Sequence, residues 1–205
     1  MIPSNPESKK DKPTENPRKS TILSKAHSAL EEIHTSIEYM KQFEDWEIRL
    51  LQENGIDFTN PKEVKRIAEY KPRFNAEDIL PLLENKISAK KAKRYPERFD
   101  GWSITGLVQA NINETKAASY PDRFDNMEIA TLVQNDINAD LAKSYPKRFN
   151  GWEIAELYLA GIKPEQAALC PKKTKTWEFI KLAQAAQQEQ PESQQPPTIK
   201  GSTPE

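Results

Sequence analysis

The feature that most constrains this chain is a pattern that recurs every 25 residues. The sequence Tyr-Pro-x-Arg-Phe occupies residues 95–99, 120–124 and 145–149, and its phenylalanines align with Phe74. In the units that begin at residues 74, 99, 124 and 149, isoleucine follows at the fifth position, leucine at the eighth and isoleucine at the thirteenth. A fixed period of this length is typical of repeat proteins, whose units bury their apolar faces only against their neighbours.

Each copy has the signals of two helices joined by a turn. The apolar residues at the fifth, eighth and ninth positions after the Phe lie on one helical face. N-cap residues precede this face, and a second, shorter helix is expected to end at the Tyr because the residue before a proline is disfavoured in helical conformation. The predicted caps are Asp100, Asp125 and Asn150 for the first helices, with Glu128 and Glu153 completing capping boxes, and Ser88, Asn113 and Lys163-Pro164 for the second.

The sequence therefore predicts an all-α fold, an α-solenoid of about five 25-residue helical hairpins. The second unit departs from the pattern, because Glu77 replaces a tryptophan and Pro81 falls inside the first helix. Proline is tolerated only in the first turn of a helix. We expect either a late helix start capped by Asp78 or a kink at Pro81. The predicted units are 43–73, 74–98, 99–123, 124–148 and 149–173, with a half-unit at 174–188.

The pattern Ala-x-x-Tyr-Pro-x-Arg-Phe-x-x-Trp-x-Ile resembles short two-helix repeats found in uncharacterised proteins. The resemblance covers about residues 43–188. It implies an α-solenoid and carries no information about chemistry.

Residues 21–42 have a different period, which predicts one amphipathic helix. Its apolar residues follow spacings of 3, 4, 3, 4 and 3 and form a single stripe. The stripe could cap the N-terminal end of the repeat stack, which we favour, or pair with another chain as a short coiled coil. The flanking segments 1–20 and 189–205 are rich in Pro, Ser, Lys and Gln and are expected to be disordered. The stripe consists of Leu23, Ala26, Leu30, Ile33, Ile37 and Met40.

The sequence contains no convincing catalytic or metal-binding constellation. His27 and His34, with Glu31 and Glu38, share one flank of the 21–42 helix, and a charged flank is favoured over a metal site. Cys170, the only cysteine, occupies the position of the repeated Tyr and is expected to be a packed structural residue rather than a nucleophile. We therefore expect no enzyme activity, no cofactor and no bound metal.

Composition narrows the setting of the protein. The formal net charge is −1, so no global field directs the chain to nucleic acid or to an anionic membrane. No run approaches the 18 apolar residues of a membrane span. The single cysteine and the absence of a signal peptide favour an intracellular, cytoplasmic protein. We expect a monomer, with a dimer through residues 21–42 as the alternative.

Two rows of repeated side chains are candidates for binding. A row of cations at the position before each Phe could follow phosphates or an acidic peptide, or could anchor the loops, which we favour. A tryptophan three residues after the Phe could grip bases or a peptide, or could cover the core between repeats, which we favour. The cations are Arg73, Arg98, Arg123, Arg148 and Lys173, and the tryptophans are Trp46, Trp102, Trp152 and Trp177.

Specificity is expected where the repeats differ, because packing does not dictate those residues. The clearest such place is a basic cluster on one second helix, formed by Lys90, Lys91, Lys93 and Arg94. Together with Arg98, Arg123 and Arg148 it forms our set of candidate partner-binding residues. The function expected first is a non-enzymatic repeat scaffold that binds a protein or peptide. The alternatives are a nucleic-acid-binding repeat protein that uses the Arg row, and an oligomeric adaptor built through the N-terminal helix.

Overall fold

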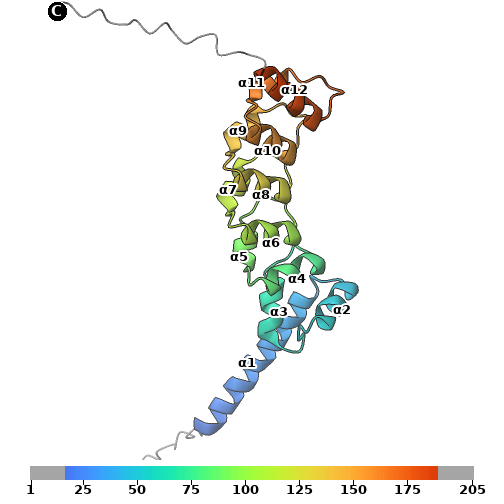
Figure 1. Cartoon of the computed structure of the whole chain (residues 1–205). Helices are drawn as coiled ribbons and strands as arrows, with labels where there is room; N and C mark the ends of the chain where they lie inside the picture. Colours follow the sequence, from blue (N-terminus) through green and yellow to red (C-terminus); the bar gives the residue numbers. More distant parts are fainter. Residues whose placement is uncertain (1–16, 189–205) are drawn as a thin grey trace, which may run out of the picture. The chain divides into compact units, whose positions relative to one another are not determined.

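A computed structural model of the chain describes residues 17–188, with side chains described from residue 24 to residue 186. These residues form twelve helices and no strand, so the fold is all-α (Figure 1). They divide into two compact units, the residues up to Ile79 (unit 1) and those from Leu80 (unit 2), and the division falls inside the fourth helix. The predicted disordered segments at 1–16 and 189–205 lie outside the described residues.

Unit 1 contains three helices and the start of a fourth. They are α1 (Pro17–Met40), α2 (Asp45–Glu53), α3 (Pro61–Ala68) and the first residues of α4 (Ala76–Glu84). The helix α1 begins four residues before the boundary expected at residue 21. It packs against α3.

Unit 2 alternates longer and shorter helices. In Figure 1 the short helices α5, α7 and α9 follow one edge of this unit, beside α6, α8 and α10. The longer helices pack in series, α6 against α8, α8 against α10, and α10 against α12. The helices are α5 (Ala89–Ala92), α6 (Gly101–Gln109), α7 (Glu114–Ser119), α8 (Asn126–Gln134), α9 (Ala139–Ser144), α10 (Gly151–Leu159), α11 (Pro164–Ala168) and α12 (Thr176–Gln188).

The predicted helix starts are confirmed in unit 2. The side chains of Asp100, Asp125 and Asn150 accept hydrogen bonds from the backbone N–H three residues on, which satisfies donors that the first helical turn leaves unpaired. Glu128 and Glu153 complete the two expected capping boxes. The shorter helices begin at the predicted caps as well, with Ser88 and Asn113 capping α5 and α7, and Pro164 in the first turn of α11.

The longer helices end in a left-handed residue followed by the repeated isoleucine. Asn111, Asp136 and Gly161 have positive φ, which closes a helix by the C-cap geometry. The next residue then donates its N–H to the carbonyl of the core leucine five residues earlier, as Ile112 does to Leu107 at 2.8 Å. The isoleucine is thereby fixed in the turn, where its side chain is buried.

Of the two alternatives expected for the second repeat, the late helix start is wrong, and the kink at Pro81 stays a prediction. Helix α4 begins at Ala76, as in the other repeats, because Asn75 caps it: the Asp78 N–H donates to Asn75 Oδ1 at 3.0 Å. The Asn75 N–H in turn donates to the Asp78 carboxylate. Pro81 lies inside the helix, which continues to Glu84. The helix is thus capped by Asn75, three residues before the residue that we expected to cap it.

Candidate protein-binding face

The core positions of unit 2 determine which side chains face outward. In α6, α8 and α10 the isoleucine at the fifth position and the leucine at the eighth are fully buried. The residue at the third position lies two residues earlier, roughly 200° around the helix axis at 3.6 residues per turn. It therefore points away from the core. Each of these helices presents its third-position side chain to solvent.

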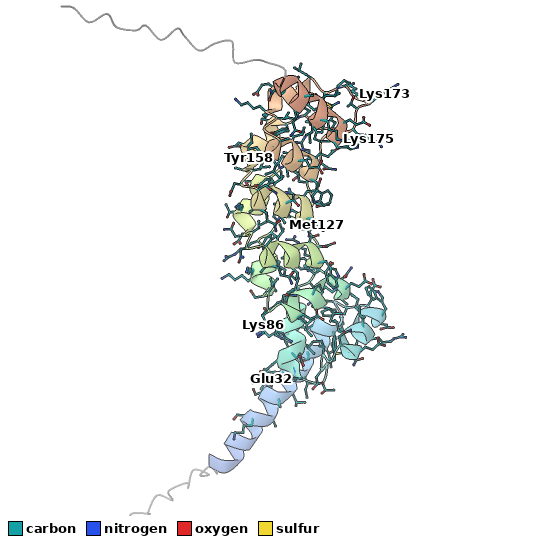
Figure 2. All side chains as sticks on the ribbon, viewed as in Figure 1. Glu32, Lys86, Met127, Tyr158, Lys173 and Lys175 are labelled. Carbon is teal, nitrogen blue, oxygen red and sulfur yellow. The ribbon has the colours of Figure 1, made fainter. Side chains whose placement is uncertain are left out.

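The third-position side chains are large and apolar in four packed helices of unit 2. Their exposed fractions range from 43% to 64%. The tryptophans are therefore not enclosed in the core, and the expectation that they cover it between repeats stays a prediction. Figure 2 labels Met127, the member of the row on α8. This set, which we name the outer row, consists of Trp102, Met127, Trp152 and Trp177; Trp46 holds the same position in unit 1 and is 44% exposed.

The helices that carry the first three members of the outer row are acidic, whereas the fourth member, Trp177, has the Lys181 ammonium 4.9 Å from its ring centroid. Helices α6, α8 and α10 contain no lysine or arginine. Their charged residues are Glu128, Glu153 and Glu156, and two of their caps are Asp100 and Asp125. Exposed aromatic and thioether groups in a field of negative charge suit a partner that brings both apolar surface and cations.

The arginine row makes intramolecular contacts in unit 2. The Arg123 guanidinium stacks on the Phe124 ring, with 4.5 Å from Cζ to the ring centroid. Its Nη2 donates to the carbonyls of Ala142 at 3.0 Å and Tyr145 at 3.4 Å, in the following repeat. Burial lowers the pKa of Arg123 from its ordinary value, although the nearby Glu128 carboxylate opposes that shift. Arg123 thus links one repeat to the next.

The neighbouring arginines repeat this arrangement. Arg98 stacks on Phe99 and donates to the carbonyls of Ala117 and Tyr120, and it also pairs with the exposed Asp122. Arg148 stacks on Phe149 and donates to the carbonyls of Ala167 and Cys170. In unit 1, Arg73 stacks on Phe74. The arginine of the repeated sequence lies at a joint between helices, which agrees with the loop-anchor interpretation.

The repeated tyrosine completes this joint. Tyr95, Tyr120 and Tyr145 are buried, and each hydroxyl donates to the carbonyl of the turn isoleucine in the next repeat, at 2.6–2.8 Å. Burial raises the pKa of each phenol above its ordinary value. Because a neutral phenol is needed to donate, burial and the hydrogen bond favour the same protonation state. Cys170, at the same position, is also buried, as predicted for a packed residue.

The basic cluster precedes the joint residue Tyr95 in the chain. Lys90, Lys91, Lys93 and Arg94 are exposed on and just after α5. Arg94 is 3.4 Å from Glu114 in an exposed pair, which is a weak interaction. The structure therefore leaves this cluster at the surface, whereas it engages Arg98, Arg123 and Arg148 in internal bonds. The role of both groups, the basic cluster and these three arginines, in binding a partner stays a prediction.

Residues 17–188 contain no further site of recognisable chemistry. No group of three or more His, Cys, Asp or Glu side chains described by the structure could hold a metal ion. His27 and Glu31 form an exposed pair at 3.2 Å on α1. None of the described helices has the length and apolar character needed to cross a membrane. Comparison of the chain with protein-family models, with curated proteins and with solved structures gave no match.

The sequence held one signal for the outer row that its interpretation missed. The third-position residue and the core isoleucine are two residues apart, a spacing that places them on opposite sides of a helix. Met127 shares this position with the tryptophans although its side chain is aliphatic. The position of a residue within the repeat therefore indicates its exposure better than its residue type does.

Proposed function

We propose that the chain is a non-enzymatic α-solenoid scaffold that binds a protein partner through the outer row. The serial packing of α6, α8, α10 and α12, and the recurring Tyr and Arg joints, support the solenoid. Repeats that present one side chain each from a rigid frame form an extended binding surface. The observation that carries the proposal is the exposure of a large apolar side chain at the same position in four packed helices.

The expected occupant is an extended peptide segment of the partner protein that carries apolar and basic residues. Tryptophan is the residue type most enriched at binding hot spots, and its face attracts cations. The members of the outer row lie on helices that pack about 8–10 Å apart, the ordinary spacing of packed helices. This distance only approximately matches the spacing of alternate side chains along an extended peptide. We expect one peptide to contact three or more members of the row, so that modest individual affinities add up to specific binding.

A peptide-display selection against the full chain tests the proposal. Enriched peptides are synthesised, and their affinity is measured by fluorescence polarisation with the wild type and with a Trp102→Ala/Trp152→Ala variant. We expect the double variant to weaken binding by at least tenfold, since each hot-spot truncation typically costs about 2 kcal/mol. Far-UV circular dichroism verifies that the variant remains folded.

The matched control is Leu169→Ala. Leu169 is a large apolar side chain that is 79% exposed and lies outside the outer row, immediately after α11. Its removal is expected to leave the affinity unchanged. Two outcomes would contradict the proposed surface. One is an equal loss of peptide affinity in Leu169→Ala and in the double variant, and the other is a double variant that binds the selected peptides as tightly as the wild type.

The alternative function, nucleic-acid binding through a row of cations, is favoured by the basic cluster on and just after α5. The proposal would pair Lys90, Lys91, Lys93 and Arg94 with phosphates. A gel-shift titration at rising salt separates the two functions, because phosphate contacts give an affinity that falls steeply with salt. A steep salt dependence that disappears in a Lys90→Glu/Lys91→Glu variant would support this alternative over the peptide scaffold.

A further inference from the structure

The helix α1 uses its polar face to pack inside unit 1. It contacts α3, and the groove between the two helices is lined by Glu32, Thr35 and Tyr39 of α1 and by Lys62 and Lys65 of α3. Ser36, on the same side of α1, is buried. The face that a soluble amphipathic helix usually turns toward its own core is therefore not the face used here.

The apolar stripe of α1 faces the other way and has no cover within the described residues. Leu30, Ile33 and Ile37 are 64%, 52% and 49% exposed. Thr35, in the groove, lies roughly 140° and 160° around the helix axis from Leu30 and Ile33 at 3.6 residues per turn. The capping interpretation requires this stripe to be buried against the repeats, so it does not account for the arrangement found.

The spacing of the stripe indicates what covers it. From Leu23 to Met40 the apolar residues follow intervals of 3, 4, 3, 4 and 3, the alternation of a heptad repeat. Helices with this period supercoil around a partner with the same period, which keeps both seams in contact along their length. Every copy of this chain carries one such seam. We propose that α1 associates with α1 of a second copy in an antiparallel pair.

The sizes of the seam residues favour the antiparallel alignment. With the two helices antiparallel and fully overlapped, Ala26 of one copy lies opposite Ile37 of the other, and Leu30 lies opposite Ile33. Each layer then combines side chains of complementary or similar volume. A parallel pair would place Ala26 against its own counterpart and leave that layer underfilled, which costs packing contacts. The side chain of Leu23 lies outside the described residues.

The charges beside the seam favour the same alignment. Histidines and glutamates alternate along one flank of α1, in the order His27, Glu31, His34 and Glu38. The antiparallel register brings this flank against itself. Glu31 of one copy lies two residues, about 3 Å along the axis, from the level of His34 of the other, and Glu38 has the same offset from His27. In a parallel pair the same flank would instead meet Ala29 and Ser36, which offer it no charge. Charge complementarity of this kind sets partner and orientation in coiled coils.

Charge also selects against a lipid surface as the occupant. Helices that lie on anionic membranes carry lysine and arginine on their polar face. Over its whole length, Pro17–Met40, α1 has three basic residues, Arg18, Lys19 and Lys25, and three glutamates, Glu31, Glu32 and Glu38, so these charges cancel. A helix without net positive charge gains no electrostatic attraction to anionic headgroups. A second copy of the chain can cover the seam without needing such an attraction.

Sedimentation velocity of the full 205-residue chain over a wide concentration range tests the association. We expect the mass to rise from 23.5 kDa toward twice that value as the concentration increases. Ile33→Glu, at the centre of the seam, should abolish the rise. Lys25→Glu places the same new charge on α1 at an exposed position away from the seam, and it should retain the rise. Circular dichroism of the Ile33→Glu variant establishes whether its helix content is preserved.

Orientation is tested by cross-linking, which does not depend on a destabilised variant. Ala26→Cys and Ile37→Cys proteins are oxidised separately and as a mixture, with the wild type as control for the buried Cys170. The proposal expects a cross-linked species in the mixture only. A wild type that stays at 23.5 kDa at every concentration, or an Ile33→Glu variant that associates like the wild type, would overturn the proposal. Cross-linking of Ala26→Cys alone would overturn the antiparallel register.

Discussion

The Glu128 carboxylate joins its own helix to Gly151 of the next repeat. Glu128 Oε2 accepts the N–H of Asp125 at 2.8 Å, and Oε1 accepts the N–H of Gly151 at 2.9 Å. Glu128 is buried, so both contacts are shielded from water. One side chain therefore caps α8 and satisfies the first amide of α10. The glutamates at the same position of two other repeats also accept hydrogen bonds from the start of a following helix: Glu47 accepts from the Ala76 N–H, and Glu153 accepts from the Thr176 hydroxyl.

Gly151→Ala is expected to destabilise unit 2. An added Cβ would lie 2.6 Å from Glu128 Cβ and 3.0 Å from the Glu128 Cα and carbonyl oxygen, so backbone must move. Overpacking of this kind costs about 1–3 kcal/mol of the unfolding free energy, which urea titration measures. Gly106→Ala is the control, because its Cβ would meet only the end of the Asn126 side chain, which can rotate away. Equal effects of the two substitutions would contradict this account.

Glu128→Ala is expected to cost more than removal of an exposed glutamate. It leaves the Gly151 amide without its acceptor, and an unsatisfied buried donor typically costs about 1–3 kcal/mol. Glu156→Ala, on the exposed side of α10, should change the unfolding free energy by no more than about 0.5 kcal/mol. Chemical denaturation of the two variants in parallel provides the comparison. Similar values for both would show that the bond to Gly151 contributes little.

Arg123→Met separates the structural role of the arginine row from a binding role. Methionine retains a long stem over Phe124 but cannot donate to the carbonyls of Ala142 and Tyr145. We expect a loss of about 1.5–3 kcal/mol, the range for hydrogen bonds to charged groups. Arg94→Met, whose only close acidic partner is 3.4 Å away and exposed, should be nearly neutral. A stable Arg123→Met protein would reopen the view that the row serves a ligand.

Lys86→Gly is expected to stabilise the protein. Lys86 has φ of 55° at the end of α4, a conformation that glycine adopts without strain and that Gly55 and Gly161 adopt at the equivalent position. Relief of this strain outweighs the greater entropy of glycine in the unfolded chain, for a net gain of roughly 0.5–1 kcal/mol. Thermal unfolding should shift upward. Lys90→Gly, inside helix α5, should shift it downward.

The stability of unit 1 is expected to fall in acid because of Glu47. Burial opposes ionisation of this carboxyl, but hydrogen bonds from Lys71 and from the backbone amides of Glu44 and Ala76 hold its pKa below the ordinary value. A depressed pKa in the folded state adds stability above the unfolded pKa, about 4.3, and this stability disappears as the pH falls through the folded value.

Glu47→Gln should flatten that part of the pH dependence. The unfolding free energy of the variant, measured between pH 7 and pH 3, is expected to decrease less than that of the wild type over the acidic range. Glu53→Gln, at an exposed site on the same helix, serves as the control and should follow the wild type. A Glu47→Gln curve parallel to the wild type would show that Glu47 is not the group responsible.

Local signals in the sequence were sufficient for the helices of unit 2. Asp100, Asp125 and Asn150 begin them as predicted, and the left-handed residues Asn111, Asp136 and Gly161 follow their ends. Caps and left-handed turn residues act through bonds within a few residues, so their effect can be read from the chain itself. Pro81 misled the prediction because the propensity of one residue was weighed above a cap formed by Asn75 and Asp78.

The sequence by itself determined the period of this protein, its helical character and the isoleucine and leucine positions of its core, because these depend on spacing and short-range bonds. Tertiary structure decided which side chains remain outside. Only packing between helices shows that Arg123 is engaged by the next repeat while Trp102 is left in solvent. Only the contact of α1 with α3 shows that the polar face is inside and the apolar stripe exposed. Burial depends on what lies opposite a residue, and a one-dimensional pattern does not contain that information.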